Sequence, residues 1–468
     1  MRSKINQFLR LGEIVSVFLS FSFYIFIWSK IKNDPEDKQA VFLRLSLEKL
    51  GSVFVKLGQM LALRPDFLSD TYCNELYKLL DKVPPFPKHY VEEIINRELN
   101  STTSELFSKF DFTPIASASF AQVHKAYLRD GSVVAVKVQR PNVKKNVDSD
   151  LSLLRKIALI ADVILKPANK MIKIVEEFEI WTKDELDYQL EAANIERFNE
   201  LENIVKDGIR GPRVYQKYST NKVLVMEYVD GYSLSQIIQA KRDKNTVILN
   251  KLKSLNFDGK LIVNKLIRNT LEMSHIHGFF HADPHPANVI YNEKGELIFI
   301  DFGIVGTLSK KERVLILRYL RSMLTGNSND AFNSLVSLCG ENTPNNLAEV
   351  RKGYDLISEK LVSTFDSKTY LAQQKQSGPI LVEVLNLLQR NGFQVPVGIV
   401  RYFKAFETIE GLIFALHPEL QIKNMVKEFR RVSILNIIDS LPTTLEEKSL
   451  NDIMLKLISS IEDGLLLR

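Results

Sequence analysis

The segment 277–303 (HGFFHADPHPANVIYNEKGELIFIDFG) constrains the fold of this chain more than any other stretch. Two short apolar runs within it flank a turn centred on Lys294–Gly295, which is typical of a β-hairpin. A symmetric hairpin at this turn places Asn288 opposite Asp301. Asp283 precedes Asn288 by five residues, on a stretch that two prolines keep out of a helix. We therefore expect Asp283, Asn288 and Asp301 to converge on one spot beside apolar strands.

These three side chains have the chemistry of a site that handles phosphates. Asn288 and Asp301 supply the oxygen ligands that suit Mg²⁺ held jointly with phosphate groups. Asp283 then remains as a general base or as a group that orients the attacking oxygen. The order D-x-x-x-x-N followed by D-F-G is typical of the catalytic and metal loops of protein kinases. Taken alone, Asp301 could simply end a strand and Asn288 could simply begin a turn. The two motifs together, in this order, favour a phosphate-handling site over these structural roles.

A transition-metal site competes with this interpretation. His275, His277, His281 and His285 lie within eleven residues, and histidine with aspartate can bind zinc or iron. The prolines prevent His281 and His285 from sharing one face of a continuous helix. We therefore favour histidines that orient the loop over histidines that bind a metal.

A second predicted hairpin carries a lysine that could act on the same phosphates. The runs AQVHKAYL and SVVAVKV flank Asp130–Gly131, a strong hairpin signal. Val133, Ala135 and Lys137 share one face of the second strand. A lysine on a small apolar face needs a counter-charge or a phosphate, and V-A-V-K is the pattern of the kinase strand that carries such a lysine. The alternative for Lys137 alone is a solubilising residue at a strand edge.

Two neighbouring segments could serve the same site. The small residues of 116–123 (ASASFAQV) would let backbone N–H groups approach phosphates, although the stretch is not G-x-G-x-x-G. The segment 183–203 is predicted as a helix, and Glu191 on it is the candidate counter-charge of Lys137. Glu185 lies more than half a turn away from Glu191. If both serve the site, the helix must end, bend or be approached from two sides. A charged, solvated helix is the alternative.

Taken together, these motifs resemble the UbiB/AarF/ADCK family of atypical kinases. The resemblance runs in the same order from about residue 36 to about residue 425. The segments that carry it are FVKLGQMLALRPDFLSDTYCNELYKLLDKVPPFP (54–87), PIASASFAQVHKA (114–126), VAVKVQRPNV (134–143), ELDYQLEAANIERF (185–198), HADPHPANV with IDFG, and VPVGIVRYFKAFETIEGL (395–412).

The resemblance implies an α+β, protein-kinase-like fold of two lobes, with an N-terminal helical extension that caps the active site and a mainly helical C-lobe. It implies ATP and Mg²⁺ as cofactors. The residue roles that it implies are Asp283, Lys137 and Glu191 in catalysis; Ala118, Ser119, Lys137, Met226, Glu227 and Tyr228 around the nucleotide, the last three as the adenine hinge; Asn288 and Asp301 on the metal; and Lys56, Gln59, Glu185 and Asp187 where the cap meets an acidic pair.

Five segments follow from the motifs and the changes of hydrophobic period. We expect a basic and apolar membrane-proximal segment at 1–35, the helical extension at 36–112, the N-lobe at 113–231 with inserted helices at about 146–182, the C-lobe at 232–430, and a helical tail at 431–468.

The resemblance implies ATP hydrolysis or small-molecule phosphorylation in support of ubiquinone or other prenylquinone synthesis, or of lipid homeostasis. Only IVGTL separates Gly303 from a helix predicted to be capped by Ser309, which leaves no room for a long activation segment. This argues against the less favoured alternative, a Ser/Thr protein kinase. A pseudokinase whose nucleotide gates the binding of lipid or partner remains open.

The N-terminal region carries the membrane signal. Ile14–Trp28 is a nearly continuous apolar run of about 22 Å as a helix, shorter than a hydrocarbon core of about 30 Å. An interfacial or partly inserted anchor, a buried helix and a true span all stay open. We expect the protein at a membrane, on the cytoplasmic face in a bacterium or on an organelle.

The expected partners are membrane lipids or prenylquinone precursors, quinone-biosynthesis enzymes and a second copy of the chain. A net charge of +6 over 468 residues is too small to indicate nucleic acid. Cys73 and Cys339 lie far apart in the sequence, so no disulfide framework is expected.

Overall fold

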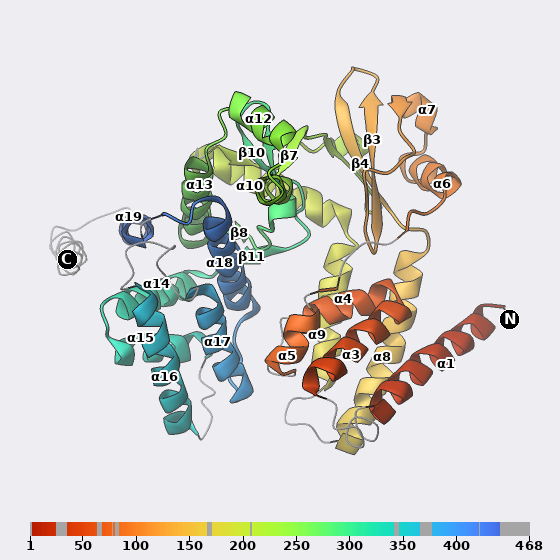
Figure 1. Ribbon diagram of the computed structural model, residues 1–468. Coiled ribbons are helices and arrows are strands. Elements are labelled where there is room, and N and C mark those ends of the chain that lie inside the picture. Colours follow the sequence, from red (N-terminus) through yellow and green to blue (C-terminus); the bar gives the residue numbers. More distant parts are fainter. Residues whose placement is uncertain are drawn as a thin grey trace, which may run out of the picture. The chain divides into compact units, whose positions relative to one another are not determined.

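The computed structural model describes residues 2–24, 35–62, 68–76, 78–79, 84–165, 171–205, 208–340, 346–365, 377–420 and 422–439 (Figure 1). The chain divides into two compact units. Unit 1 comprises Met1–Ala193 and Arg213–Tyr228, and unit 2 comprises Asn194–Pro212 and Val229–Arg468.

An antiparallel sheet forms one part of unit 1. Its strands follow the order β1-β3-β4-β6, with β2 paired to β3. The bounds are β1 Phe107–Phe110, β2 Ala116–Ser117, β3 Ala121–Leu128, β4 Val133–Gln139 and β6 Val223–Glu227. The predicted hairpin is confirmed, because β3 pairs with β4 over seven residue pairs and Gly131 takes a positive φ of 86° in the loop between them.

Unit 1 has two separate hydrophobic cores. Helices that precede or follow the sheet strands along the chain contribute to both cores. Helix α6 (Lys88–Leu99) packs Val91, Ile94 and Ile95 against the sheet valines. The second core lies among helices that are far apart in the sequence. These are α1 Arg2–Phe23, α3 Glu36–Leu50, α4 Ser52–Leu61, α5 Asp70–Leu76, α8 Val143–Leu165 and α9 Met171–Glu185. The N-terminal extension thus shares its core with the inserted helices, while α6, the short α7 (Thr103–Leu106) and β1 pack with the sheet.

The first helix is tied to this second core. Ile14 and Val17 are buried in it, whereas Leu19 and Phe23 are 65% and 54% exposed. The Arg10 guanidinium bonds Asp150 of α8 at 2.9 Å and the Leu50 carbonyl at the end of α3. The predicted apolar run therefore lies in α1 up to Phe23, and its residues 25–28 lie outside the described part. In the described ranges, no helix combines the length and apolar character needed to cross a bilayer.

Unit 2 contains two small sheets. One has the order β5-β10-β9-β7 and the other pairs β8 with β11. The bounds are β5 Ile209–Arg210, β7 Gly231–Ser233, β8 Phe279–His281, β9 Val289–Asn292, β10 Leu297–Phe299 and β11 Val305–Thr307.

Helices make up most of unit 2. Helix α10 (Tyr188–Val205) begins in unit 1 and continues into unit 2. The others are α11 Leu234–Arg242, α12 Thr246–Ser254, α13 Gly259–Glu272, α14 Lys310–Leu324, α15 Ser328–Leu338, α16 Leu347–Phe365, α17 Ser377–Arg390, α18 Val397–Leu416 and α19 Ile422–Asp439. The predicted cap of α14 is confirmed, since Ser309 and Glu312 form a reciprocal capping box. Of the predicted C-terminal tail, residues 440–468 lie outside the described part.

Candidate active site

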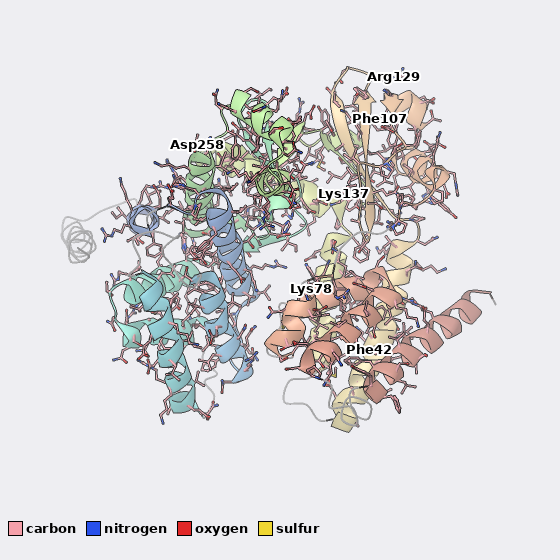
Figure 2. All side chains as sticks on the ribbon, in the orientation of Figure 1. Phe42, Lys78, Phe107, Arg129, Lys137 and Asp258 are labelled. Atoms are coloured by element: carbon pink, nitrogen blue, oxygen red, sulfur yellow. The ribbon has the colours of Figure 1, made fainter. Side chains whose placement is uncertain are left out.

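A buried ion pair joins the sheet of unit 1 to the first turn of α10. Lys137 Nζ on β4 lies 2.8 and 2.7 Å from the two carboxylate oxygens of Glu191. Figure 2 labels Lys137 among the side chains of unit 1. The Glu191 side chain is 4% exposed and that of Lys137 is 16% exposed. The Tyr188 ring lies 5.2 Å from the ammonium, and the helix N-terminus favours a carboxylate at this position. The pairing expected from the sequence is therefore present.

The predicted continuous helix over 183–203 is wrong. Helix α9 ends at Glu185 and α10 begins at Tyr188. Asp187 lies in the break, and its Oδ1 accepts hydrogen bonds from the backbone N–H groups of Gln189 and Leu190 at 3.0 and 3.3 Å. The reason is the capping preference of aspartate, which starts a new helix here. Of the three geometries left open for Glu185 and Glu191, the helix end is the one observed.

Glu185 meets the N-terminal helices through Lys56. Lys56 Nζ on α4 lies 2.7 Å from Glu185 Oε1, and these side chains are 12% and 24% exposed. The same ammonium lies 6.0 Å from the Phe120 ring centroid. Gln59 instead donates from Nε2 to the Leu79 carbonyl at 3.2 Å. Lys56 and Glu185 are thus brought together as expected, while Gln59 stabilises the helical core from within.

The small-residue loop is a tight turn between β2 and β3. The Ala118 N–H donates to the Ala121 carbonyl at 2.9 Å, so this amide is already used by the turn. Ser119 is fully buried. Phe120 is 3% exposed and belongs to the helical core of unit 1. Phe120 therefore anchors the loop to the helices, a role that the sequence reasoning missed although it is the single aromatic residue among small ones.

Arg140, just after β4, is a second residue that the sequence reasoning missed. Its Nε donates to the Ala118 carbonyl at 2.9 Å. Its Nη2 donates to Ser117 Oγ at 2.9 Å and to the Pro84 carbonyl at 3.0 Å. These bonds hold the loop 116–121 in place. The signal in the sequence that could have indicated this role is a cation directly after V-A-V-K-V-Q.

The predicted hinge lies at the end of β6. Met226 is buried and pairs with Ala135 of β4. The Glu227 N–H donates to the Arg213 carbonyl at 2.8 Å, and the Tyr228 N–H donates to the Val133 carbonyl at 3.1 Å. Since both of these amides are engaged in strand pairing, a nucleobase at this hinge has to use other main-chain groups.

In unit 2, the loop after β8 brings Asp283 and Asn288 together. Asn288 Nδ2 donates to Asp283 Oδ2 at 3.2 Å, and a 3₁₀ turn over Pro286–Asn288 holds the asparagine in place. Because this bond uses the Asn288 Nδ2, the Oδ1 of the same amide remains available to bind a cation.

The predicted register of the following hairpin is wrong by one residue. Ile300 donates its N–H to the Asn288 carbonyl, so Asn288 lies opposite Ile300 rather than Asp301. The reason is a three-residue loop closed by Asn292 and Glu296, in which Gly295 takes φ 76°, in place of a symmetric turn. Asp301 nevertheless follows Ile300 directly, one residue beyond the residue that pairs with Asn288.

His281 orients Asp301. Its Nε2 donates to the Asp301 carbonyl at 2.5 Å, and its ring stacks on Phe299 with centroids 4.2 Å apart. Burial lowers the pKa of His281, while the carboxylates of Asp283 and Asp301 act in the opposite direction. This bond is of the kind expected for a histidine that orients the loop. The described residues contain no group of three or more His, Cys, Asp or Glu that could hold a metal ion.

The side chain of Asp301 is exposed, and its Oδ1 accepts from the Gly303 N–H at 2.9 Å. Phe302, by contrast, is fully buried against Phe198 of α10, with ring centroids 5.2 Å apart. Arg401 of α18 donates to the Val305 carbonyl at 2.9 Å. The chain after Gly303 thus enters β11 at once and reaches α14 without a long activation segment, as expected.

The donor set fits the proposed cation. The exposed carboxylate of Asp301 and the amide oxygen of Asn288 are the hard oxygen ligands that Mg²⁺ takes when phosphates complete its coordination. A lysine on a strand, paired with a helix carboxylate, and this acidic loop cluster are the two halves of kinase chemistry. The fold and these two groups define a protein-kinase-like protein of the α+β class.

Comparison with known proteins gives the family. A family model described as "ABC1 atypical kinase-like domain" matches residues 78–335, and the chain belongs to this family. It is 30% identical over 417 residues to "Probable protein kinase UbiB" of Shewanella baltica (strain OS185), covering 86% of this chain and 71% of the relative. The family resemblance and the kinase-like α+β fold expected from the sequence are thereby confirmed.

Two further relatives show how widely the similarity extends. A protein named "Uncharacterized protein in hydrogenase 1 5'region" of Clostridium pasteurianum is 32% identical over 433 residues, covering 90% of this chain and 76% of the relative. "Protein ACTIVITY OF BC1 COMPLEX KINASE 7, chloroplastic" of Arabidopsis thaliana is 32% identical over 404 residues, covering 84% of this chain and 55% of the relative. Among solved structures, "The complex structure of Rv3197-erythromycin from Mycobacterium tuberculosis" has 23% identity and a TM-score of 0.46, covering 77% of this chain and 91% of that one.

Proposed function

We propose that this protein is an Mg²⁺-dependent, ATP-binding atypical kinase or ATPase. The observation that carries the proposal is the Lys137–Glu191 ion pair, because a buried lysine held by a helix carboxylate is what kinases present to nucleotide phosphates. The Asp283–Asn288 bond beside Asp301 supports it from unit 2. Family membership supports the step of assigning both groups to one nucleotide.

In this proposal each side chain has one task. Lys137 neutralises phosphate charge while Glu191 fixes its position. Asn288 and Asp301 hold Mg²⁺, which when bound neutralises the charge that develops on the phosphates. Asp283 accepts the proton of the attacking hydroxyl or orients a water molecule. His281 keeps the Asp301 main chain in place through its bond to the carbonyl.

The acceptor is proposed to be water or a small molecule. The short connection from Gly303 through β11 to α14 supports this, because protein kinases dock peptides on a longer segment at this point. We propose that the activity supports prenylquinone synthesis or lipid homeostasis at a membrane, either bacterial or of an organelle. Lipids, prenylquinone precursors, quinone-biosynthesis enzymes and a second copy of the chain are the proposed partners.

A second candidate function is a nucleotide-gated switch without catalysis. The contacts that favour it run from Lys56 to Glu185 and to the Phe120 ring, since they connect the N-terminal helices to the loop 116–121. Through such contacts, nucleotide binding could change what the helices bind.

The test compares two variants by calorimetry and by phosphate release. Asp301→Asn should abolish Mg²⁺-dependent ATP binding with unchanged circular dichroism. Asp283→Asn should bind ATP but lose turnover, and the exposed Asp243→Asn at the end of α11 is the matched control. Unchanged binding by Asp301→Asn would contradict the proposal. Full turnover by Asp283→Asn would remove that residue from catalysis, and binding without turnover in the wild type would favour the switch.

A further inference from the structure

Unit 1 contains a second basic feature, a groove of about 650 Å³ between the end of β4, helix α6 and the start of α8. Five basic residues line it, against the single acidic residue Asp148. The basic residues are Arg97, Arg140, Lys144, Lys145 and Lys222. None of them was assigned a role by the sequence motifs, and of the five only Arg140 is bonded to a loop of the nucleotide site proposed above.

The charges of this groove are only partly neutralised. Lys222 lies 2.8 Å from Glu98, and Arg97 lies 3.5 Å from Glu93 and 3.8 Å from Glu98. Lys144 and Lys145, in the first turn of α8, are exposed and make no ion pair with any residue that the structure describes. A concave surface lined by cations of this kind concentrates anions, and the N–H groups at the start of a long helix add to the attraction.

The groove is physically connected to the loop 116–121. Arg140 forms part of the groove wall and at the same time donates to the Ala118 carbonyl and Ser117 Oγ. Its own N–H donates to the Phe120 carbonyl at 2.8 Å. A ligand that draws the guanidinium toward the groove therefore acts on Ser117 and Ala118 of the loop.

We propose that this groove binds a phosphate-bearing anion and that Arg140 transmits its occupancy to the loop 116–121. The volume of about 650 Å³ is large enough to hold a diphosphate or a phospholipid headgroup. Lysines recognise phosphate as point charges and arginine recognises it through its planar fork, so the residue set suits this chemistry. The inference goes beyond the proposed function, because the groove would bind its ligand whether or not ATP is hydrolysed.

The experiment measures binding of two probes to the full chain at saturating Mg²⁺ and non-hydrolysable ATP analogue, which fills any phosphate site at Lys137. The first probe is inorganic pyrophosphate, and its binding is measured by calorimetry. The second probe is vesicles of phosphatidylcholine with or without phosphatidylglycerol, and their binding is measured by flotation. Lys144→Gln/Lys145→Gln should weaken binding about 30-fold in at least one arm, since each lysine near an anionic surface contributes about fivefold.

The matched control is Lys310→Gln/Lys311→Gln. These two lysines also lie in the first turn of a long helix, α14, and line a cavity of about 600 Å³, but no other basic residue lines it. The control should bind like the wild type. Loss in the pyrophosphate arm alone identifies a soluble phosphate compound, and loss in the vesicle arm alone identifies a lipid headgroup. Equal loss in both double variants, or no binding by the wild type in either arm, would overturn the proposal.

Arg140→Lys tests the connection separately. It keeps the positive charge of the groove but loses the planar fork that bonds Ser117 and Ala118. The variant should still bind the probe, whereas the slowing of amide hydrogen exchange at residues 116–121 that the probe produces in the wild type should disappear. If the exchange of these amides does not respond to the probe in the wild type, Arg140 transmits nothing and that half of the proposal is wrong.

Discussion

A double-mutant cycle on Lys137 and Glu191 should reveal a large coupling between the two side chains. Lys137→Met leaves the carboxylate of Glu191, which is 4% exposed, without its cation. Breaking a buried pair costs about 3–5 kcal/mol, and we expect about 3 because water reaches part of the site. Glu191→Gln should cost about 2 kcal/mol, because the 16% exposed lysine can turn toward solvent.

The double variant is the informative member of the cycle. It buries no uncompensated charge, so it should also cost only about 2 kcal/mol, which gives a coupling of about 3 kcal/mol. Urea unfolding monitored by tryptophan fluorescence measures this, because Trp181 lies in α9 of unit 1.

A surface pair in the same unit provides the control for this cycle. Lys88 and Glu92 lie 3.5 Å apart and are 58% and 39% exposed, so Lys88→Met/Glu92→Gln should show a coupling below about 0.5 kcal/mol. If the Lys137–Glu191 coupling is no larger than that of the control, the reasoning from burial is refuted.

Two further predictions concern unit 2. Gly306→Ala should lower the stability by about 1–3 kcal/mol, since the new Cβ would lie 2.1 Å from the buried Phe280 ring. Gly411→Ala in α18, where the Cβ meets open space, should raise the stability by up to about 1 kcal/mol. Thermal unfolding measures both changes, and a shift of both variants in the same direction would contradict the reasoning. Burial lowers the pKa of His275 to about 3, so below pH 6.5 the unfolded chain takes up the proton first and stability should fall by up to about 1.4 kcal/mol per pH unit toward pH 3. His275→Asn should remove that slope, and parallel curves of unfolding free energy against pH for the two proteins would rule the contribution out.

Local signals in the sequence were sufficient for the features that depend on neighbouring residues. The hairpin at Gly131, the cap at Ser309 and the short connection after Gly303 follow from turn chemistry and chain length, and the structure contains all three. The Lys137–Glu191 pair spans 54 residues and was still predictable, because a lysine on an apolar strand face has few ways to be neutralised.

Features that depend on packing could not be derived in the same way. The hairpin after Asn288 fits a symmetric turn and a three-residue loop with the same residues, and the main-chain pairing of Asn292 with Glu296 distinguishes them. Phe120 and Arg140 carry no periodic pattern of their own. Their partners come from helices and loops more than twenty residues away, which hydrophobic spacing does not register.

The break between α9 and α10 has a consequence for how this site can change during evolution. In one continuous helix, inserting or deleting a residue between Glu185 and Glu191 would rotate everything after it by about 100°. Because Asp187 starts a new helix, the phase of α10 is set by its own cap. The carboxylate that faces Lys56 and the one that faces Lys137 can therefore be adjusted independently, so the contact with Lys56 can diverge while the partner of Lys137 is preserved.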